Sequence, residues 1–87
     1  MPIALTLLMK PGCHLCDTAR EVVAGVVAEL EGIPTAARVT VSELSSLADP
    51  ELVERYAEEI PVLLIDGRVH TIWRIDPARL RAALLED

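Results

Sequence analysis

The sequence predicts a single α/β domain over residues 1–87, with strands and helices in the order β-α-β-α-β-β-α. Three observations predict this class. An apolar run at the start is followed by a turn and then by a helical pattern, which is typical of a strand-to-helix junction. Asp66-Gly67 joins two extended runs, as in a β-hairpin. Asp-Pro pairs at 49–50 and 76–77 predict two further helix starts.

The first strand and the first helix are predicted from hydrophobic spacing. Ile3 to Leu8 is a continuous apolar run between Pro2 and the Pro11-Gly12 turn, so we expect a central strand that is buried on both faces. A helix follows and ends at Gly32 and Pro34. We expect Gly25 to mark a close approach of this helix to the sheet. The predicted buried stripe of the helix consists of Leu15, Ala19, Val22, Val23, Val26, Val27 and Leu30.

A second strand and a short helix are predicted next. Residues 36–41 alternate weakly and are bounded by the polar segment Ser42 to Ser46. Asp49 is the expected N-cap of a helix of two to three turns that begins at Pro50. Its inner side is predicted to be Leu52, Val53, Tyr56 and Ala57.

The end of the chain predicts a hairpin and a last helix. The hairpin strands are Val62 to Ile65 and Arg68 to Trp73, and the Asp-Gly pair between them favours a type I′ turn. Asp76 is the expected N-cap of the last helix. The buried stripe of that helix is predicted to be Leu80, Ala83 and Leu84.

The two cysteines of the chain, Cys13 and Cys16, stand at the predicted strand-to-helix junction. Cys13 falls where the helix begins, at the positive end of the helix dipole, where unpaired backbone N–H groups stabilise a thiolate. Cys16 comes one helical turn later, close enough to form a disulfide with Cys13. The spacing therefore predicts a redox-active or metal-binding pair.

Charge and composition exclude several classes of partner. The formal net charge of −6, with eight scattered Lys and Arg residues, repels nucleic acid and anionic membrane surfaces. The apolar start of the chain lacks a basic segment and a small-residue cleavage site, and it is too short to span a bilayer. We therefore expect a cytoplasmic protein. Thiols are kept reduced in that compartment, which favours redox or metal chemistry over a structural disulfide.

The order of elements, the Cys13-His14-Leu15-Cys16 motif and Ile60-Pro61-Val62 before the hairpin resemble the thioredoxin fold, and specifically short bacterial glutaredoxin-like proteins. The resemblance covers nearly the whole chain and implies a four-stranded mixed sheet flanked by helices. It also implies that Pro61 is cis and faces the dithiol. The backbone that precedes Pro61 would then pair with an extended substrate.

The resemblance also implies a mechanism and a set of neighbouring residues. Cys13 attacks a substrate disulfide, and Cys16 resolves the mixed disulfide. Lys10 resembles a similarly placed Lys of glutaredoxins that adds positive potential, although a solvated loop charge explains it equally well. His14 either stabilises the thiolate as a cation or is an uninvolved surface residue. Asp17 is read as a favourable acid in the first turn of the helix.

The sequence departs from glutaredoxins and from thioredoxins at places that bear on cofactors and partners. Glutaredoxins have an aromatic residue inside the motif and a Gly-Gly pair after the last strand, where glutathione binds. This chain has His14-Leu15 and Ile72-Trp73-Arg74 at those places, which argues against glutathione and leaves no expected cofactor. Thioredoxins have a buried acid and a Trp before the motif, which this chain lacks. We therefore expect a monomer that acts on a protein or low-molecular-weight disulfide and is recharged by an unidentified reductase.

Two other classes remain open from the sequence. Cys13 and Cys16 could bind copper with Met9, zinc with His14 or His70, or an iron-sulfur cluster bridged between two chains. The predicted last helix argues against a copper-carrying domain, because those domains end on a strand. A non-catalytic binding domain is the second alternative. Trp73 and Arg74 could contact a partner near the site, although a Trp at a strand end is more often core or rim.

Overall fold

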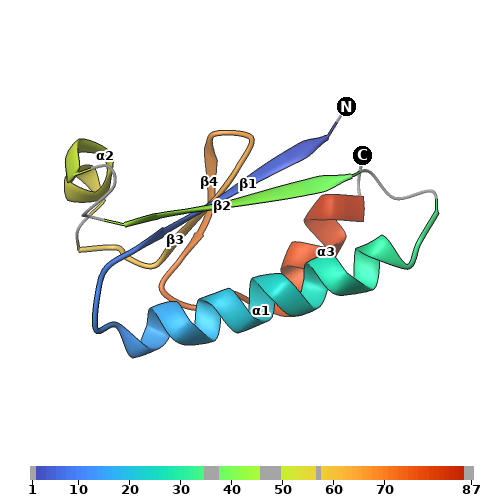
Figure 1. Ribbon diagram of the computed structural model, residues 1–87, viewed down its shortest axis with the longest axis horizontal. Helices are drawn as coiled ribbons and strands as arrows, with labels where there is room; N and C mark the ends of the chain where they lie inside the picture. The colour runs from blue at the N-terminus through green and yellow to red at the C-terminus, as the bar shows by residue number, and fades with distance from the viewer. Residues whose placement is uncertain (1, 35–37, 46–49, 57, 86–87) are drawn as a thin grey trace.

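The protein is built around one mixed sheet (Figure 1). The computed structural model describes residues 2–34, 38–45, 50–56 and 58–85. The sheet has four strands in the order β2-β1-β3-β4, with β2 parallel to β1, β3 antiparallel to β1 and β4 antiparallel to β3. This arrangement confirms the predicted α/β class and the order of elements. In chain order the elements are β1 (Ile3–Met9), α1 (His14–Glu31), β2 (Val39–Ser45), α2 (Pro50–Arg55), β3 (Val62–Ile65), β4 (Arg68–Ile72) and α3 (Pro77–Leu85).

The two longer helices lie on the same side of the sheet, whereas α2 lies at one end of it (Figure 1). Residues of β1, β3, α1 and α3 form one hydrophobic cluster. The most deeply buried large side chains of this cluster are Leu5, Leu7, Leu8, Val26, Val62, Leu63, Leu80 and Leu84. Burial of such aliphatic side chains supplies most of the free energy that holds the helices on the sheet.

Strand β1 is central, as predicted, but it is not buried on both faces along its whole length. Ile3, Leu5 and the segment from Leu7 to Met9 are buried, whereas Ala4 is exposed and Thr6 is half-buried. The difference arises because α1 and α3 cover only one side of the sheet and the short α2 lies at its end. The first half of β1 therefore alternates like a strand with one solvated face.

Helix α1 begins and ends close to the predicted positions, but its buried stripe is shifted. The buried residues are Cys16, Ala19, Val23, Val26 and Leu30. Leu15 was predicted to be part of this buried stripe, yet it is 40% exposed. The prediction was wrong at this position because the stripe runs at spacings of three and four residues from Cys16, which leaves Leu15 at its edge.

Gly25 does not approach the sheet, contrary to the prediction, since a Cβ added there meets no atom within 4 Å and the residue is exposed. Gly25→Ala is expected to raise the free energy of unfolding by about 0.5–1 kcal/mol, because Ala has the higher helix propensity. Gly67→Ala is the matched contrast: φ is +83° there, a conformation in which Ala is strained, so we expect a loss of about 1 kcal/mol. Urea denaturation of both variants checks the opposite signs, and a gain for Gly67→Ala would contradict the assigned turn.

Strand β2 extends further than predicted, because Ser42 to Ser45 belong to the strand and not to the loop after it. The strand pairs in parallel with β1 from Ile3 opposite Val39 to Met9 opposite Ser45. It lies at the edge of the sheet, where polar side chains can remain in water, so its composition resembles a loop. Residues 36–37 of the predicted strand lie outside the described residues.

Helix α2 has six residues and is shorter than the predicted two to three turns. The expected N-cap Asp49, the expected inner residue Ala57 and the side chains of Leu52 and Val53 lie outside the described part of the chain. Tyr56, which follows the helix, is half-buried against the hydrophobic cluster, as predicted.

The hairpin between β3 and β4 turns at Asp66-Gly67, as predicted. Both residues have positive φ, 50° and 83°, which a type I′ turn requires. The turn is tied to β1, because Asp66 Oδ1 accepts a hydrogen bond from the Ala4 N–H at 2.9 Å and the Asp66 N–H donates to the Ala4 carbonyl at 2.8 Å. Strand β4 ends at Ile72, so the prediction that it includes Trp73 was wrong.

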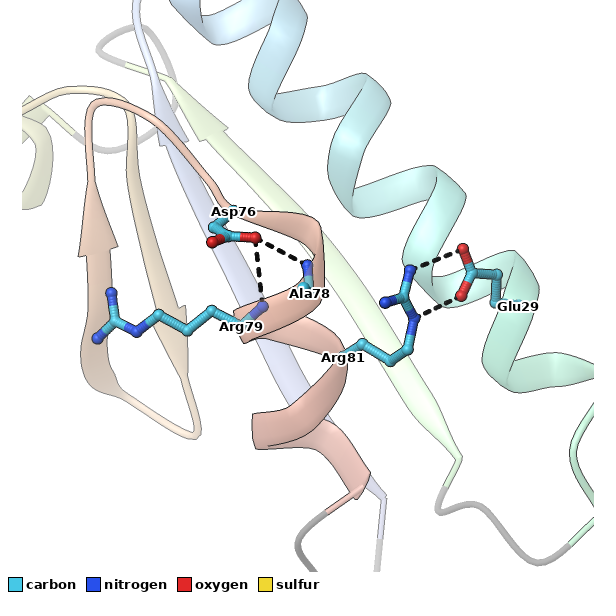
Figure 2. A network of polar contacts seen from close by, with 5 residues as sticks. All are labelled: Glu29, Asp76, Ala78, Arg79 and Arg81. Atoms are coloured by element: carbon cyan, nitrogen blue, oxygen red, sulfur yellow. Dashed lines mark hydrogen bonds and ion pairs between the residues drawn. The ribbon is translucent and has the colours of Figure 1, made fainter.

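Helix α3 is capped and tied to α1 by the contacts drawn in Figure 2. Asp76 Oδ1 accepts from the N–H groups of Ala78 and Arg79 at 2.9 and 3.4 Å, as expected for an N-cap. Arg81 donates two hydrogen bonds to the carboxylate of Glu29, which lowers the pKa of Glu29 and raises that of Arg81. Because this ion pair is exposed, it orients α3 more than it stabilises the fold. Leu80 and Leu84 are buried and Ala83 is half-buried.

Candidate dithiol site

The two cysteines lie at one end of the sheet, where β1 passes through residues 10–12 into α1. Gly12 has φ +71°, which favours glycine at this bend. The strand register brings the other elements to the same end: Met9 lies opposite Ser45, and Leu8 lies opposite Val62. Pro61 directly precedes Val62, and the Ile60-Pro61 peptide bond is cis.

Cys13 is the N-cap residue of α1. Its backbone is extended, with φ −102° and ψ 113°, so its side chain turns back over the first turn of the helix. Its Sγ accepts a hydrogen bond from the Cys16 N–H at 3.2 Å, and its carbonyl accepts from the Asp17 N–H at 3.3 Å. The half-buried sulfur therefore accepts from a backbone N–H that has no partner within the helix, at the positive end of the helix dipole. This environment stabilises negative charge on sulfur.

Cys16 lies in a different environment one turn further along α1. The residue is 3% exposed and belongs to the hydrophobic core. Burial raises the pKa of Cys16 to about 11, and a hydrogen bond with the Cys13 side chain is the second largest cause. A hydrogen bond with the Lys10 backbone acts in the opposite direction. The Cys16 side chain is therefore a neutral thiol near neutral pH.

The raised pKa of Cys16 predicts a pH-dependent stability of the reduced protein. The folded state favours the protonated thiol, so its contribution to stability is complete below pH 9 and is lost as the pH rises from the ordinary value of 9.0 towards about 11. The loss is expected to be at most about 3 kcal/mol. Urea denaturation between pH 8 and 11 checks it. A Cys16→Ala variant should lack this part of the pH dependence, and an equal dependence in both proteins would contradict the assignment.

The other predicted site residues lie around this pair. Lys10 is exposed in the loop before Cys13, and its charge acts weakly on Cys16. His14 is exposed at the first position of α1, and its carbonyl accepts a hydrogen bond from Thr18 Oγ1 at 3.3 Å. Ile60 and Pro61 are buried, and the Pro61 carbonyl accepts from the Trp73 N–H at 2.7 Å.

A cavity of about 270 Å³ gives access to both cysteines. The charged residues that line it are Lys10, Asp17 and Arg20, and the remaining lining residues are Met9, Pro11, Gly12, Cys13, Cys16 and Ser45. The dithiol is therefore open on the side of β2. A small disulfide can reach the sulfurs through this opening.

Of the residues named for a metal site, Met9 lines the cavity with both cysteines and His14 directly follows Cys13, whereas His70 lies on β4. Met9 is buried, and its sulfur accepts a hydrogen bond from Arg20 Nη2 at 3.7 Å. His70 is half-buried on β4. Burial and the neighbouring Arg79 lower the pKa of this histidine. Within the described ranges, His, Cys, Asp and Glu side chains form no cluster of three or more that could hold a metal ion.

Arg20 was not singled out from the sequence. Its Nε donates to Glu43 Oε2 on β2 at 3.0 Å, so it crosses from α1 to the edge strand beside the cavity. Helical spacing could have found it, because Arg20 follows Cys16 by four residues and therefore lies on the same side of α1. The contact with Glu43 depends on the parallel pairing of β2, which the sequence did not reveal.

This mixed sheet, with a dithiol at the first strand-to-helix junction and a cis-proline before the third strand, defines a thioredoxin-like fold. Comparison with known proteins gives the family. The model of the "Glutaredoxin-like domain (DUF836)" matches residues 4–85, and the chain belongs to this family.

Relatives and solved structures agree with this assignment. "Uncharacterized protein Rv0508" of Mycobacterium tuberculosis is 36% identical over 76 residues, which cover 87% of this chain and 76% of that protein. "Uncharacterized protein Mb0520" of Mycobacterium bovis matches to the same extent. The solution structure of the structural-genomics target XcR50 from X. campestris is 34% identical, with a TM-score of 0.67, and covers 97% of this chain and 95% of that chain.

The X-ray structure of XcR50 gives a TM-score of 0.65 at 32% identity and covers 95% of this chain and 97% of that chain. A structure described as a malarial protein has a TM-score of 0.69 at 9% identity and covers 99% of this chain and 96% of that chain, so it supports the fold alone.

Among the described residues, no helix combines the length and the apolar character needed to cross a membrane.

Proposed function

We infer that this protein is a thiol-disulfide oxidoreductase. The observation that carries this inference is the hydrogen bond from the Cys16 N–H to Cys13 Sγ at 3.2 Å. It places one partly exposed sulfur over the start of α1 and the second, buried sulfur one turn behind it. Membership of the glutaredoxin-like family supports the same reading.

The reaction begins with the Cys13 thiolate. It attacks one sulfur of a substrate disulfide, a Cys13–substrate disulfide forms, and the other substrate sulfur leaves as a thiolate that takes up a proton. Cys16 then loses its proton and attacks Cys13 Sγ, and the second substrate sulfur leaves. The substrate has gained two electrons and two protons, and the protein ends with a Cys13–Cys16 disulfide.

The environment of Cys16 gives these two steps their order. Burial and the Cys13 side chain both raise the pKa of Cys16, so Cys16 does not compete for the substrate while Cys13 is free. When Cys13 enters a mixed disulfide, its negative charge disappears. The part of the pKa rise that comes from Cys13 is then removed, and Cys16 becomes easier to ionise only when a bond is ready to be resolved.

The neighbouring residues suggest how a substrate is held. Lys10, with His14 when it is protonated, supplies positive charge beside Cys13. The Pro61 carbonyl is already bonded to Trp73, so pairing with an extended substrate falls to the backbone of Ile60. We propose a monomer that works in the reducing cytoplasm and is recharged by a reductase, with glutathione a weak candidate because Trp73 and Arg74 replace the Gly-Gly pair.

The test is to incubate the reduced protein with two substrates in separate reactions. One is the small disulfide hydroxyethyl disulfide, and the other is a protein with disulfides, such as insulin. Mass spectrometry should show the loss of two hydrogen atoms from the protein, about 2 Da, through a new Cys13–Cys16 disulfide, with a matching gain of substrate thiols. Equilibration against glutathione buffers then gives the reduction potential. A protein whose two thiols remain unchanged, or which is purified with stoichiometric metal on both cysteines, would contradict the proposal.

A further inference from the structure

Strand β2 forms one edge of the sheet, and within the described residues β1 is the one strand that pairs with it. The Ile3 N–H donates to the Arg38 carbonyl at 2.7 Å, so the backbone of Arg38 points towards β1. Successive residues of a strand turn their backbone groups to opposite sides. The N–H and C=O groups of Val39, Val41 and Glu43 therefore point away from the sheet, where they are placed to pair with a further strand.

This edge lacks the features that usually protect an edge strand from pairing with another chain. Such edges are blocked by Pro, by Lys or other charges, or by a bulge. Strand β2 contains neither Pro nor Lys, and its register with β1 is unbroken from end to end. Its one charged side chain, Glu43, is already paired with Arg20 at 3.0 Å. The edge is therefore available to an additional strand.

A row of cavities runs between β2 and α1 and begins at the dithiol. The dithiol cavity shares Arg20 with a second cavity of about 250 Å³, which shares Val27 with a third cavity of about 560 Å³. We call this row, from Arg20 through Val27 and Val41 to Ile33, the β2 groove. Val41 is 42% exposed and Ile33 is 38% exposed, so apolar surface lies directly beside the open edge.

The charged side chains of the β2 groove favour a ligand without net charge. Arg20 and Glu43 neutralise each other at the dithiol end. Glu31 and Arg38 bring one charge of each sign to the third cavity. The apolar side chains that line the second cavity include Val23, Val27 and Val41. The groove therefore complements an uncharged segment with aliphatic side chains.

We propose that an extended, uncharged segment of a substrate protein adds to β2 as a further strand and places its aliphatic side chains in the β2 groove. The proposal rests on the function inferred above and adds the substrate class: a protein whose reducible cysteine lies a few residues from a β-prone apolar segment. In strand addition, main-chain hydrogen bonds give affinity and alternate side chains give selectivity. This segment is separate from the residues next to the half-cystine, which would pair with Ile60.

The dithiol is within reach of a chain that is paired with β2. Ser45, the last residue of β2, lines the cavity that contains both cysteines. Since an extended residue spans about 3.3–3.6 Å, a spacer of two or three residues carries a cysteine from the end of β2 into that cavity. Antiparallel pairing, the more stable arrangement, places the cysteine before the paired segment.

The test compares two peptide disulfides in the full-length protein. One is the disulfide-linked dimer of Cys-Gly-Gly-Thr-Val-Thr-Val-Thr, and the other is the dimer of the same peptide with Pro in place of each Val. The parent should have a kcat/KM at least about tenfold higher for the Val peptide, mainly through KM, because each Pro removes a strand hydrogen bond. Equal kcat/KM values for the two peptides would overturn the proposal.

Two matched variants locate the preference on the molecule. Val41→Lys places a charge at the open edge and should abolish the preference for the Val peptide. Val69→Lys is the control, because Val69 is 47% exposed on β4, the opposite edge strand, and it should leave the preference unchanged. A preference that survives in Val41→Lys, or that both variants lose, would overturn the proposal. If Val41→Lys does not fold, Ile33→Lys at the far end of the groove should lower the preference several-fold and decides the outcome.

A binding measurement separates this proposal from the redox function. In a Cys13→Ser, Cys16→Ser double variant, the anisotropy of fluorescein-labelled Ser-Gly-Gly-Thr-Val-Thr-Val-Thr should rise on titration with protein. The Pro peptide should bind at least about tenfold more weakly, and adding Val41→Lys should remove this difference. If the parent reduces neither disulfide but this difference is found, the redox function fails and the docking on β2 stands. Equal binding of both peptides, or sedimentation of the parent as a dimer that Val41→Lys dissociates, overturns the docking.

Discussion

Cys13→Ser is expected to lower the rate of disulfide reduction at least about a hundredfold, because a serine hydroxyl is a far weaker nucleophile towards a disulfide than the sulfur proposed to attack from the start of α1. Cys16→Ser is expected to have a different result. Its Cys13 still attacks, but no second sulfur can displace the substrate, so a mixed disulfide accumulates. Mass spectrometry should find this variant heavier by one substrate half, and reduction with dithiothreitol should reverse the change.

The control for these variants is Ala24→Ser, which places the same hydroxyl on an exposed position of α1. It should keep the rate of the parent. The assignment of roles also predicts that iodoacetamide at neutral pH modifies Cys13 before Cys16, because burial and a raised pKa protect Cys16. A Cys13→Ser variant as active as the parent, or earlier alkylation of Cys16, would contradict the proposed roles.

Leu80→Ala is expected to lower the free energy of unfolding by about 2–5 kcal/mol, since it removes a fully buried side chain from α3 and leaves a cavity between the helix and the sheet. A domain of this length has a total stability of about 4–13 kcal/mol, so the loss is a large fraction of the whole. Urea denaturation followed by circular dichroism measures it, and the slope of the transition should stay the same.

Leu85→Ala is the matched control on the same helix, because Leu85 is 45% exposed. It should change the free energy of unfolding by less than about 0.5 kcal/mol. Equal losses in the two variants would contradict the packing of α3 on the sheet. Retention of disulfide reduction by folded Leu80→Ala would show that α3 supports the fold and not the chemistry directly.

The parts of the fold that were predicted correctly depend on local signals. Asp66-Gly67 specifies a turn with two positive φ angles, and Asp76 supplies its own N-cap hydrogen bonds within three residues. Ser42 to Ser45 were missed because their strand is made by pairing with β1, some 36 residues earlier in the chain. No local pattern distinguishes a polar edge strand from a loop.

The part of the candidate site that was predicted from the sequence also depends on local signals. Cys13 at the start of the helix follows from the turn at Pro11-Gly12 and the apolar spacing after it, and the structure places it there as the N-cap. The roles of Lys10, His14, Ile60 and Pro61 remain predictions. Trp73 and Arg74 were named from the sequence as possible partner contacts. The cavity that they line with Leu15 was not predicted, because Leu15 and Trp73 are 58 positions apart in the chain and meet only through packing of the helix against the β4–α3 connection.

The amino-acid sequence by itself determined the order of elements, the turns and the one-turn spacing of the two sulfurs, since these depend on backbone preferences and hydrophobic periodicity within a few residues. Only the tertiary structure decided which sulfur is buried, which side of the first helix turn remains open and how Trp73 is held. Those properties depend on desolvation and on contacts between distant segments, and both arise only when the sheet, α1 and the β4–α3 connection come together.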